Sequence, residues 1–550
     1  MAKPEMYSPY ISATQLRNLL SDGEELALLD VREGGIFAQS HLLTACSLPL
    51  SQLELEIPPL LPRKSVRLVL LDDSPALVAG AAQAATNILR RFGYLNVSIL
   101  NGGIAAWGEA GYELFSGTFV PSKAFGEVVE HVNDTPRIDA DVLRQWQADG
   151  RKMVVLDSRP MDEYQMMSIP GAADCPGAEL VYRLPQLVDD DDTTVVVNCA
   201  GRTRSIIGAQ SLRNAGFKNP IYALKNGTMG WHLAGLKVAK GANNLAPEPT
   251  GEALARAQEH AMQVANQYGV QRVSRKQLTQ MQADDSRTTY LFDVRLPPAY
   301  RAGHLAGSIN APGGQLVQAT DTYAPVSGAR IVLIDEHRVQ AIMTAHWLLQ
   351  MGWREVFVLI DAVVGAQAVR AGVPQEIGRG LVPGLGQSEL SAPELSPAQL
   401  LAAHKSNLVE IIDVGASLKY RKSRIPGAYY AIRSRLAACL SRFDKDTRLV
   451  FVCSDGRLSR YSAADAVALG YANSASLAGG TEAWKHSGFA TEASSGDDDP
   501  KLLTTTDDVW YKPYDKSAGV EQAMLQYLTW EVNLVDQLKR EPYLKFALHG

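Results

Sequence analysis

The chain repeats one pattern four times along its 550 residues, and this repetition constrains its fold more than any other feature. In each repeat a first apolar run ends in an aspartate, and a second apolar run ends 42, 42, 42 and 40 residues later. The two landmarks are Asp30 and Asp72, Asp157 and Cys199, Asp293 and Asp335, and Asp413 and Cys453. Because a single hydrophobic core does not serve a chain of this length, the repeats predict four domains of ordinary size.

Later landmarks recur in the same order. Each repeat has a helix-like stretch that ends in glycine and an aromatic residue, at Tyr94, Phe217, Trp353 and Tyr471. A third apolar run then leads into a glycine-rich turn that ends at Trp107, Trp231 and Trp484, whereas the third copy reads Val363 to Gln367. Short β-branched runs that alternate with helical stretches favour an α/β fold, in which a parallel sheet is covered by helices on both faces.

Composition excludes several classes of protein. The formal net charge of −6 comes from mixed charges without a basic stripe, so we expect no binding to nucleic acid. No apolar run reaches the length that spans a membrane, and the first residues lack the apolar core of a signal peptide. The five cysteines are scattered and odd in number, which favours free thiols in a reducing cytoplasm. No cysteine or histidine cluster indicates a metal site, and we expect no bound cofactor.

Cys199 ends a strand-like run and opens a short loop, which a helix-like stretch follows at once. This arrangement creates an anion cradle, because backbone N–H groups converge on one spot and the helix dipole favours negative charge. Arg202 and Arg204 add positive charge, so we expect the thiol to ionise readily and to act as a nucleophile. A cysteine at a strand end is more often a small buried hydrophobe, but the repeated context favours the functional interpretation.

These landmarks together resemble the rhodanese family. The family's Asp-x-Arg is present as Asp30-Val-Arg32, Asp157-Ser-Arg159 and Asp293-Val-Arg295. Its Ile-Pro-Gly-Ala turn is present at 169–172 and 425–428, with a looser version at 303–308. The resemblance implies a five-stranded parallel sheet in each domain. It also implies a cysteine that carries sulfane sulfur as a covalent persulfide.

We therefore predict four tandem rhodanese-like domains followed by a C-terminal helical tail. The predicted bounds are 5–118, 130–242, 266–376 and 390–494, with the tail at 500–550. An additional helix is expected at 251–268. In the tail, Val520 to Arg540 has a helical apolar period at Met524, Leu525, Leu528, Val532, Val535 and Leu538. This helix is expected to pack either on a neighbouring domain or on a second subunit. In the second case the tail would form a homodimer.

The four loops are not equivalent. Repeats 1 and 3 carry Asp72 and Asp335 at the position of the cysteine, and a carboxylate there cannot form a persulfide. We interpret both repeats as inactive structural partners of their neighbours. The chain is then expected to form two pairs of successive repeats, 1 with 2 and 3 with 4.

The two cysteine loops also differ from each other. The loop of Cys453 has its arginine one place early, ends in a leucine and contains an acidic residue, and repeat 4 has Gly415 where the Asp-x-Arg arginine belongs. Cys453 can accordingly be a second catalytic residue or a site that has lost its function. The predicted substrate-binding residues are Ala200, Gly201, Arg202, Thr203 and Arg204, with Ser454, Asp455, Gly456, Arg457 and Leu458. The predicted structural supports are Asp157, Arg159, Asp413, Trp231 and Trp484.

The resemblance implies a sulfurtransferase. It would move sulfur from an anionic donor, thiosulfate or a persulfide, to a thiol or cyanide through a cysteine persulfide. A phosphatase or arsenate reductase of the same fold needs a longer Cys-x5-Arg loop, and the corresponding positions are Ser205 and Ser459. A third interpretation is a regulatory scaffold in which the domains without a loop cysteine bind a partner.

Overall fold

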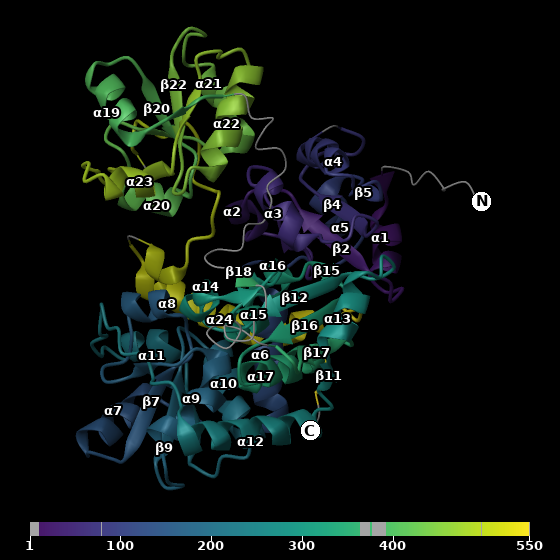
Figure 1. Cartoon of the computed structure of the whole chain (residues 1–550), viewed down its shortest axis with the longest axis vertical. Coiled ribbons are helices and arrows are strands. Elements are labelled where there is room, and N and C mark those ends of the chain that lie inside the picture. Colours follow the sequence, from purple (N-terminus) through teal and green to yellow (C-terminus); the bar gives the residue numbers. More distant parts are fainter. Residues whose placement is uncertain are drawn as a thin grey trace, which may run out of the picture.

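The computed structural model describes residues 10–78, 80–362, 392–496, 498–516 and 518–548, and a short strand at 375–376. Four sheets are arranged along the chain, one for each repeat, and a C-terminal helical region follows them (Figure 1). The four units are called domains 1 to 4 below. The glycine-rich turn of repeat 3, the start of domain 4 at 390 and the ends of the predicted domain 1 and tail ranges lie outside the described residues.

All four domains have a central sheet whose own strands are parallel and follow one order. Domain 1 has β1 (Tyr10–Ile11), β5 (Val97–Leu100), β4 (Arg67–Leu71), β2 (Leu26–Asp30) and β3 (Cys46–Ser47). Domain 2 has β6 (Arg137–Ile138), β10 (Ile221–Leu224), β9 (Thr194–Asn198), β7 (Met153–Asp157) and β8 (Ala173–Asp174). Domain 3 has β11 (Gln271–Val273), β17 (Val356–Leu359), β16 (Arg330–Ile334), β12 (Thr289–Asp293) and β14 (Ile309–Asn310). Domain 4 has β19 (Glu394–Leu395), β23 (Ala475–Leu477), β22 (Leu449–Val452), β20 (Glu410–Asp413) and β21 (Tyr429–Tyr430). The predicted α/β fold class with four tandem sheets is confirmed.

Helices flank each sheet. Domain 1 contains α1 (Ala13–Leu19), α2 (Gly34–Phe37), α3 (Leu53–Leu60), α4 (Ala81–Arg91) and α5 (Gly103–Glu109), and α6 (Val120–Asn133) leads to domain 2. Domain 2 contains α7 (Ala140–Ala148), α8 (Met161–Met166), η1 (Gly177–Glu179), α9 (Leu180–Leu187), α10 (Thr203–Asn214) and α11 (Gly227–Leu233), and α12 (Gly251–Gln267) leads to domain 3. Domain 3 contains α13 (Arg275–Gln282), α14 (Pro297–Ala302), α15 (Gly313–Gln318), α16 (Thr320–Tyr323) and α17 (Val339–Gln350), and β13 (His304–Leu305) pairs with β18 (Gln375–Glu376). Domain 4 contains α19 (Pro397–Lys405), α20 (Ser417–Lys422), η2 (Arg433–Arg435), α21 (Leu436–Leu440), α22 (Arg457–Ala468) and α23 (Gly480–His486). The tail contains η3 (Pro513–Asp515) and α24 (Val520–Leu538).

The domains pack in an order that differs from the predicted succession. Domain 3 lies between domains 1 and 2, and domain 4 sits on domain 1 (Figure 1). Domain 2 meets domain 3 through α10 and α17, where the Trp347 indole N–H donates to the Ser211 hydroxyl at 2.8 Å. Domain 4 meets domain 1 through a buried ion pair in which Arg433 donates to Glu54 at 2.7 Å. Each domain with a loop cysteine therefore has a partner whose loop carries an aspartate at that position, but the pairs are 2 with 3 and 4 with 1.

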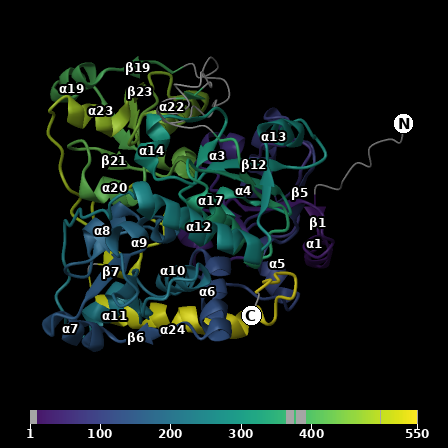
Figure 2. The same ribbon diagram turned by 60° about the horizontal axis from the view of Figure 1, so that its bottom comes forward.

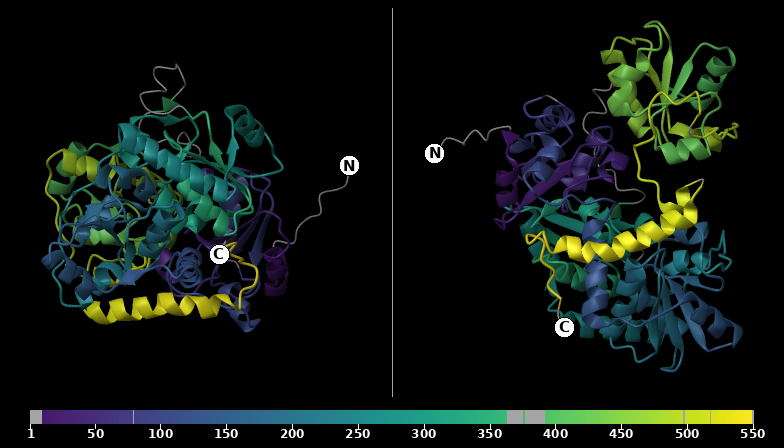
Figure 3. Two further views of the ribbon diagram at one scale, coloured as in Figure 1. Left: turned by 90° about the horizontal axis from the view of Figure 1, so that it is seen from below. Right: turned by 180° about the vertical axis from the view of Figure 1, so that it is seen from behind.

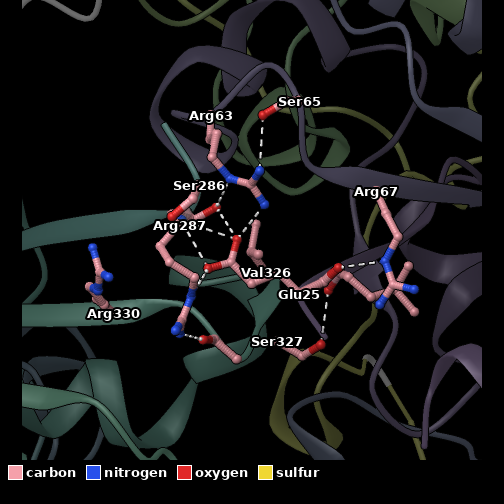
Figure 4. Close-up of polar contacts among 12 residues, drawn as sticks. Glu25, Arg63, Ser65, Arg67, Ser286, Arg287, Val326, Ser327 and Arg330 are labelled. Carbon is pink, nitrogen blue, oxygen red and sulfur yellow. Dashed lines mark hydrogen bonds and ion pairs between the residues drawn. The ribbon is translucent and has the colours of Figure 1, made fainter. Parts of the chain in front are cut away.

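A buried glutamate of domain 1, Glu25, binds residues of both domain 1 and domain 3 (Figure 4). The carboxylate of Glu25 accepts hydrogen bonds from Arg63 at 2.6 Å, from Arg287 at 2.9 Å and from the Thr288 hydroxyl at 2.7 Å. Beside it, β15 (Val326–Ser327) of domain 3 extends the sheet of domain 1 by antiparallel pairing with β2. The two domains are thus joined by one hydrogen-bonded sheet and one set of charged contacts.

The tail helix α24 packs on its own chain. It begins beside domain 2, crosses α6 and ends against domain 1 (Figures 2 and 3). The helix itself is confirmed, but its buried face is rotated from the predicted one: Met524, Leu528 and Leu534 are buried, whereas Leu525 and Val532 are 55% and 48% exposed. A homodimer through the tail stays a prediction. Much of the apolar face of α24 already packs against other parts of the same chain.

No helix in the described part of the chain has the length and apolar character needed to cross a membrane.

Candidate active site

Cys199 lies directly after the central strand β9, at the carboxyl edge of the sheet. The loop from Cys199 to Arg202 leads into α10, whose first N–H groups have no partner within a helix and face the loop. The Cys199 sulfur lies 3.5 Å from the Ser205 hydroxyl, and that hydroxyl donates to the Arg202 carbonyl at 2.8 Å. The strand end, the loop and the helix N-terminus therefore form the cradle that the sequence predicts.

A chain of hydrogen bonds fixes the backbone of Cys199. Asp157 is fully buried and accepts from Arg159 at 2.7 Å and from the Asn198 amide at 2.7 Å. The same amide donates to the Thr228 hydroxyl at 3.1 Å, and that hydroxyl donates to the Cys199 carbonyl at 3.0 Å. The predicted support Asp157 is thus connected to the cysteine through two intermediate groups, the Asn198 amide and the Thr228 hydroxyl, with Arg159 as its counterion.

The glycine-rich turn closes the other side of the cradle. Gly227 has φ +54°, and a Cβ there would lie 2.3 Å from the Cys199 carbonyl oxygen, so only glycine permits this approach. Trp231, four residues later, is buried and donates its indole N–H to the Lys237 carbonyl at 2.9 Å. Trp484 has the same arrangement in domain 4, donating to the Ala490 carbonyl at 2.8 Å. Both tryptophans belong to the hydrophobic cores.

The two arginines of the loop have different environments. Arg204 donates to Glu163 at 2.7 Å, and its charge stabilises the thiolate of Cys199. Arg202 instead binds two carboxylates of α6, Glu127 at 2.6 Å and Glu130 at 2.7 Å. Both arginines are therefore paired with carboxylates, and Arg204 is the one whose charge acts on the Cys199 sulfur.

Burial dominates the ionisation of Cys199. The residue is only 2% exposed, and loss of solvation raises the pKa of its thiol. Arg204 and the hydrogen bonds from Ser205 oppose this increase, and Glu531 of the tail adds to it. The expectation of a thiol that ionises readily is therefore wrong for the closed arrangement seen here, because desolvation outweighs the cradle.

The tail supplies a cover that sequence reasoning did not assign to this site. Met524 and Leu528 of α24 form an apolar cluster with Ala200 and Met229 around the loop. Thr203, the first residue of α10, donates to Glu531 at 3.3 Å. The only sequence signal for this contact was an amphipathic helix outside the repeats.

Cys453 occupies the matching place after β22 in domain 4. Its sulfur accepts the Ser459 backbone N–H at 3.4 Å and lies 3.6 Å from the Ser459 hydroxyl. Gly456 makes the turn into α22 with φ +84°, and Leu458 is buried in the core beside it. The Asp455 carboxylate is 3.7 Å from the sulfur.

The charges around Cys453 disfavour its thiolate. Burial raises the pKa of the Cys453 thiol, and Asp455 and Asp413 raise it further. Asp413 has no arginine of the Asp-x-Arg type; it accepts the Gly415 N–H at 2.8 Å, and burial raises its pKa to about 7. Arg457 stabilises the ionised form of Glu56 of domain 1, so this arginine faces the interdomain contact. Ser454 follows the cysteine, and its carbonyl accepts the Glu482 N–H at 2.9 Å.

Alkylation with iodoacetamide should separate the two cysteines. Arg204 favours the thiolate of Cys199, whereas Asp455 opposes that of Cys453, so the labelling rate of Cys199 should rise at a lower pH than that of Cys453. The midpoint of each pH–rate profile is compared, because limited access lowers the rate without moving the midpoint. Peptide mapping assigns each rate, and a midpoint for Cys453 at or below that of Cys199 would refute this order.

In domains 1 and 3 an aspartate carboxylate occupies the cradle. Asp72 accepts the Ala82 N–H of α4 at 2.9 Å and the Ser74 hydroxyl at 2.7 Å. Asp335 accepts the Gln340 N–H of α17 at 3.1 Å. Each carboxylate therefore takes the place that a bound anion would have at a helix N-terminus.

The described residues include five free cysteines, all of them buried. Burial raises the pKa of the Cys46, Cys175 and Cys439 thiols, which lie outside the two loops. Within the described residues, no group of three or more histidine, cysteine or acidic side chains is arranged to hold a metal ion.

Comparison with known proteins identifies the family. The rhodanese-like domain model matches residues 12–110, 139–234, 274–368 and 396–487, which together exceed half of the chain. The chain belongs to the rhodanese-like domain family. Each matched segment covers one of the four sheets except its first strand, so these are tandem rhodanese-like domains.

A solved structure matches almost the whole rhodanese-like chain. This is a thiosulfate sulfurtransferase from Pseudomonas aeruginosa, with a TM-score of 0.90 and 42% identity, and the match covers 99% of this chain and 100% of that one. Two curated relatives match a single domain. One is an HTH-type transcriptional regulator of Mycobacterium tuberculosis, 37% identical over 105 residues, 19% of this chain and 44% of the relative. The other is a tRNA uridine(34) hydroxylase of Bordetella parapertussis, 34% identical over 99 residues, 17% of this chain and 41% of the relative. The chain thus spans less than half the length of these two relatives.

Proposed function

We propose that this protein is a rhodanese-type sulfurtransferase that moves sulfane sulfur through a persulfide on Cys199. The observation that carries the proposal is the cradle, where the Cys199 sulfur lies against the N-terminus of α10 and Arg204 favours its thiolate. The similarity to a thiosulfate sulfurtransferase over the whole chain supports it. The proposal needs no cofactor or metal, since the cysteine itself carries the sulfur.

The first half-reaction loads the cysteine. The Cys199 thiolate attacks the outer sulfur of thiosulfate, a new S–S bond forms, and the S–S bond of the donor breaks so that sulfite leaves with the electron pair. Arg204 and the N-terminus of α10 favour an anionic donor, and the same groups stabilise the negative charge of the persulfide. A low-molecular-weight persulfide can serve as the donor by the same chemistry.

The second half-reaction transfers the sulfur from Cys199 to the acceptor. An acceptor thiolate or cyanide attacks the outer sulfur, the bond to Cys199 breaks, and the cysteine returns as a thiolate. Cys453 is proposed as a second, slower site, because the carboxylate of Asp455 lies near its sulfur where Arg204 acts on that of Cys199. A reducing cytoplasm suits five free cysteines, and the proposed partners are small sulfur compounds and not nucleic acid or membrane.

Two other functions have less support. A phosphatase or arsenate reductase would need an arginine where Ser205 contacts the Cys199 sulfur. A partner-binding scaffold was suggested by the two domains that lack a loop cysteine, but both domains pack against other domains of the same chain, which gives them a structural role.

Steady-state kinetics tests the covalent two-step route. With thiosulfate and cyanide as substrates, double-reciprocal plots at several fixed cyanide concentrations should be parallel, because sulfite leaves before cyanide binds. Intersecting lines would show that both substrates bind together, and no turnover at all would contradict the proposed function.

A further inference from the structure

The tail places a carboxylate with one unused oxygen over the Cys199 loop. Glu531 is 2% exposed. Its Oε1 accepts the Tyr527 hydroxyl at 3.0 Å and the Thr203 hydroxyl at 3.3 Å, whereas its Oε2 is buried and has no hydrogen-bond partner among the described residues. Buried polar atoms are nearly always hydrogen-bonded, so an unpartnered oxygen at a reactive loop points to a missing ligand group.

That oxygen faces the backbone next to the cysteine. A Cβ built on Gly201 would lie 3.1 Å from Oε2 and 3.3 Å from the Tyr527 ring. Glu531 is also close enough to Cys199 to disfavour its thiolate. Oε2 therefore lies beside the loop that would carry the Cys199 persulfide.

Charged groups from α6 and from the Cys199 loop surround this carboxylate. Lys123 of α6 and Arg202 of the loop favour its ionised form, and Glu127 of α6 opposes it. Lys123 is held against the rings of Tyr527 and Trp530, 4.6 Å from each centroid, and burial lowers its pKa to about 8. Burial raises the pKa of Glu531, which makes the carboxylate a stronger base than one in water.

We propose that Glu531 is a catalytic base that takes the proton from the acceptor thiol in the second half-reaction at Cys199. This proposal rests on the proposed function. As Oε2 accepts the proton, the acceptor sulfur forms a bond to the outer sulfur of the persulfide. The bond between that sulfur and Cys199 breaks, and its electron pair stays on Cys199 as the thiolate. The acceptor leaves as a persulfide and no oxidant or reductant is consumed.

The carboxylate also sets the class of acceptor. A negative charge over the loop repels an anionic thiol, whereas a neutral thiol with an ionisable S–H can use the base. The preferred acceptor is therefore a neutral thiol, in contrast to the anionic donor that Arg204 favours in the first half-reaction.

The test separates loading from unloading in the full chain. A Cys453→Ser background leaves Cys199 as the reporting site, and thiosulfate followed by desalting loads it. The persulfide is then mixed with 2-mercaptoethanol, a neutral monothiol, and its loss is followed by rapid quench and mass spectrometry. Glu531→Gln should load normally but unload at least about 10²-fold more slowly at pH 7, the usual contribution of a general base.

The pH dependence distinguishes a base from a structural residue. The Glu531→Gln defect should shrink as pH rises toward the pKa of the thiol, because the acceptor then arrives already ionised. Asp536→Asn is the matched control on the same helix, where the side chain is 81% exposed, and it should behave as the parent. If Glu531→Gln folds poorly, Glu531→Asp is expected to unload at an intermediate rate with the same pH trend.

Two outcomes would overturn the inference. One is unloading of Glu531→Gln at the parental rate at pH 7, and the other is a defect of constant size across pH, which indicates misplaced packing. Failure of the parent itself to load with thiosulfate would instead contradict the proposed function.

Discussion

Replacing Cys199 with serine is expected to lower thiosulfate–cyanide turnover by at least about 10³-fold, because a hydroxyl at this position is a far weaker nucleophile than a thiolate. Ser205 and Ser459 make equivalent hydrogen bonds to the two sulfurs, but Arg204 favours the thiolate of Cys199 whereas Asp455 and Asp413 oppose that of Cys453. The initial rate at saturating thiosulfate measures the effect.

Cys453→Ser is the matched control for that substitution. It removes a cysteine of equal burial from the same position of the repeated fold, so it reports any general cost of the change. This variant should keep most of the turnover. A fully active Cys199→Ser chain beside an inactive Cys453→Ser chain would reverse the assignment of the two sites.

Glu25→Ala should be the most destabilising single change at the interface of domains 1 and 3. It leaves Arg63, Arg287 and the Thr288 N–H without the carboxylate that all three now bind. Breaking a fully buried ionic contact on one side costs about 3–5 kcal/mol, and the partial exposure of Arg63 and Arg287 places the expected loss near the lower end of this range. The free energy of unfolding from a urea titration, followed by tryptophan fluorescence, measures the loss.

Asp22→Ala is the comparison for Glu25. Asp22 binds Arg67 at 2.7 Å in the same domain, but its side chain is 33% exposed. Exposed pairs contribute at most about 1 kcal/mol, so this variant should unfold close to the parent. Equal destabilisation by the two substitutions would show that Glu25 does not hold the domains together.

The four sheets could be predicted from sequence because their landmarks are local. Each apolar run, the aspartate that ends it and the turn glycines lie within one repeat, and a strand, a loop and a helix N-terminus follow from neighbouring residues. The cradle at Cys199 was predicted for the same reason. The family match then applies to each repeat separately.

The packing of the domains could not be predicted in this way. Glu25 and Thr288 are 263 residues apart, and neither stands in a distinctive local pattern. Successive repeats were the simplest pairs, but the contacts of Arg433 with Glu54 join domains 4 and 1. Interfaces of this kind depend on which surfaces meet, and a linear pattern does not contain that information.

The sequence alone indicated only some of the charges that act on the Cys199 site. The loop contains two arginines, yet Glu127 of α6 compensates Arg202 from outside the repeat. In the tail, the apolar period indicated a helix, but a glutamate within its buried face has no apolar signal. Glu531 therefore became visible only when α24 was seen to lie over the loop.

Peptide-level mass spectrometry after thiosulfate treatment tests the central claim most directly. The wild-type chain is treated, desalted, alkylated and digested, and the peptides that contain Cys199 and Cys453 are compared with those of the two serine variants. We predict one additional sulfur atom on the Cys199 peptide, in the wild type and in Cys453→Ser. A Cys199 peptide without added sulfur, in a chain that still turns over thiosulfate, would contradict the assignment.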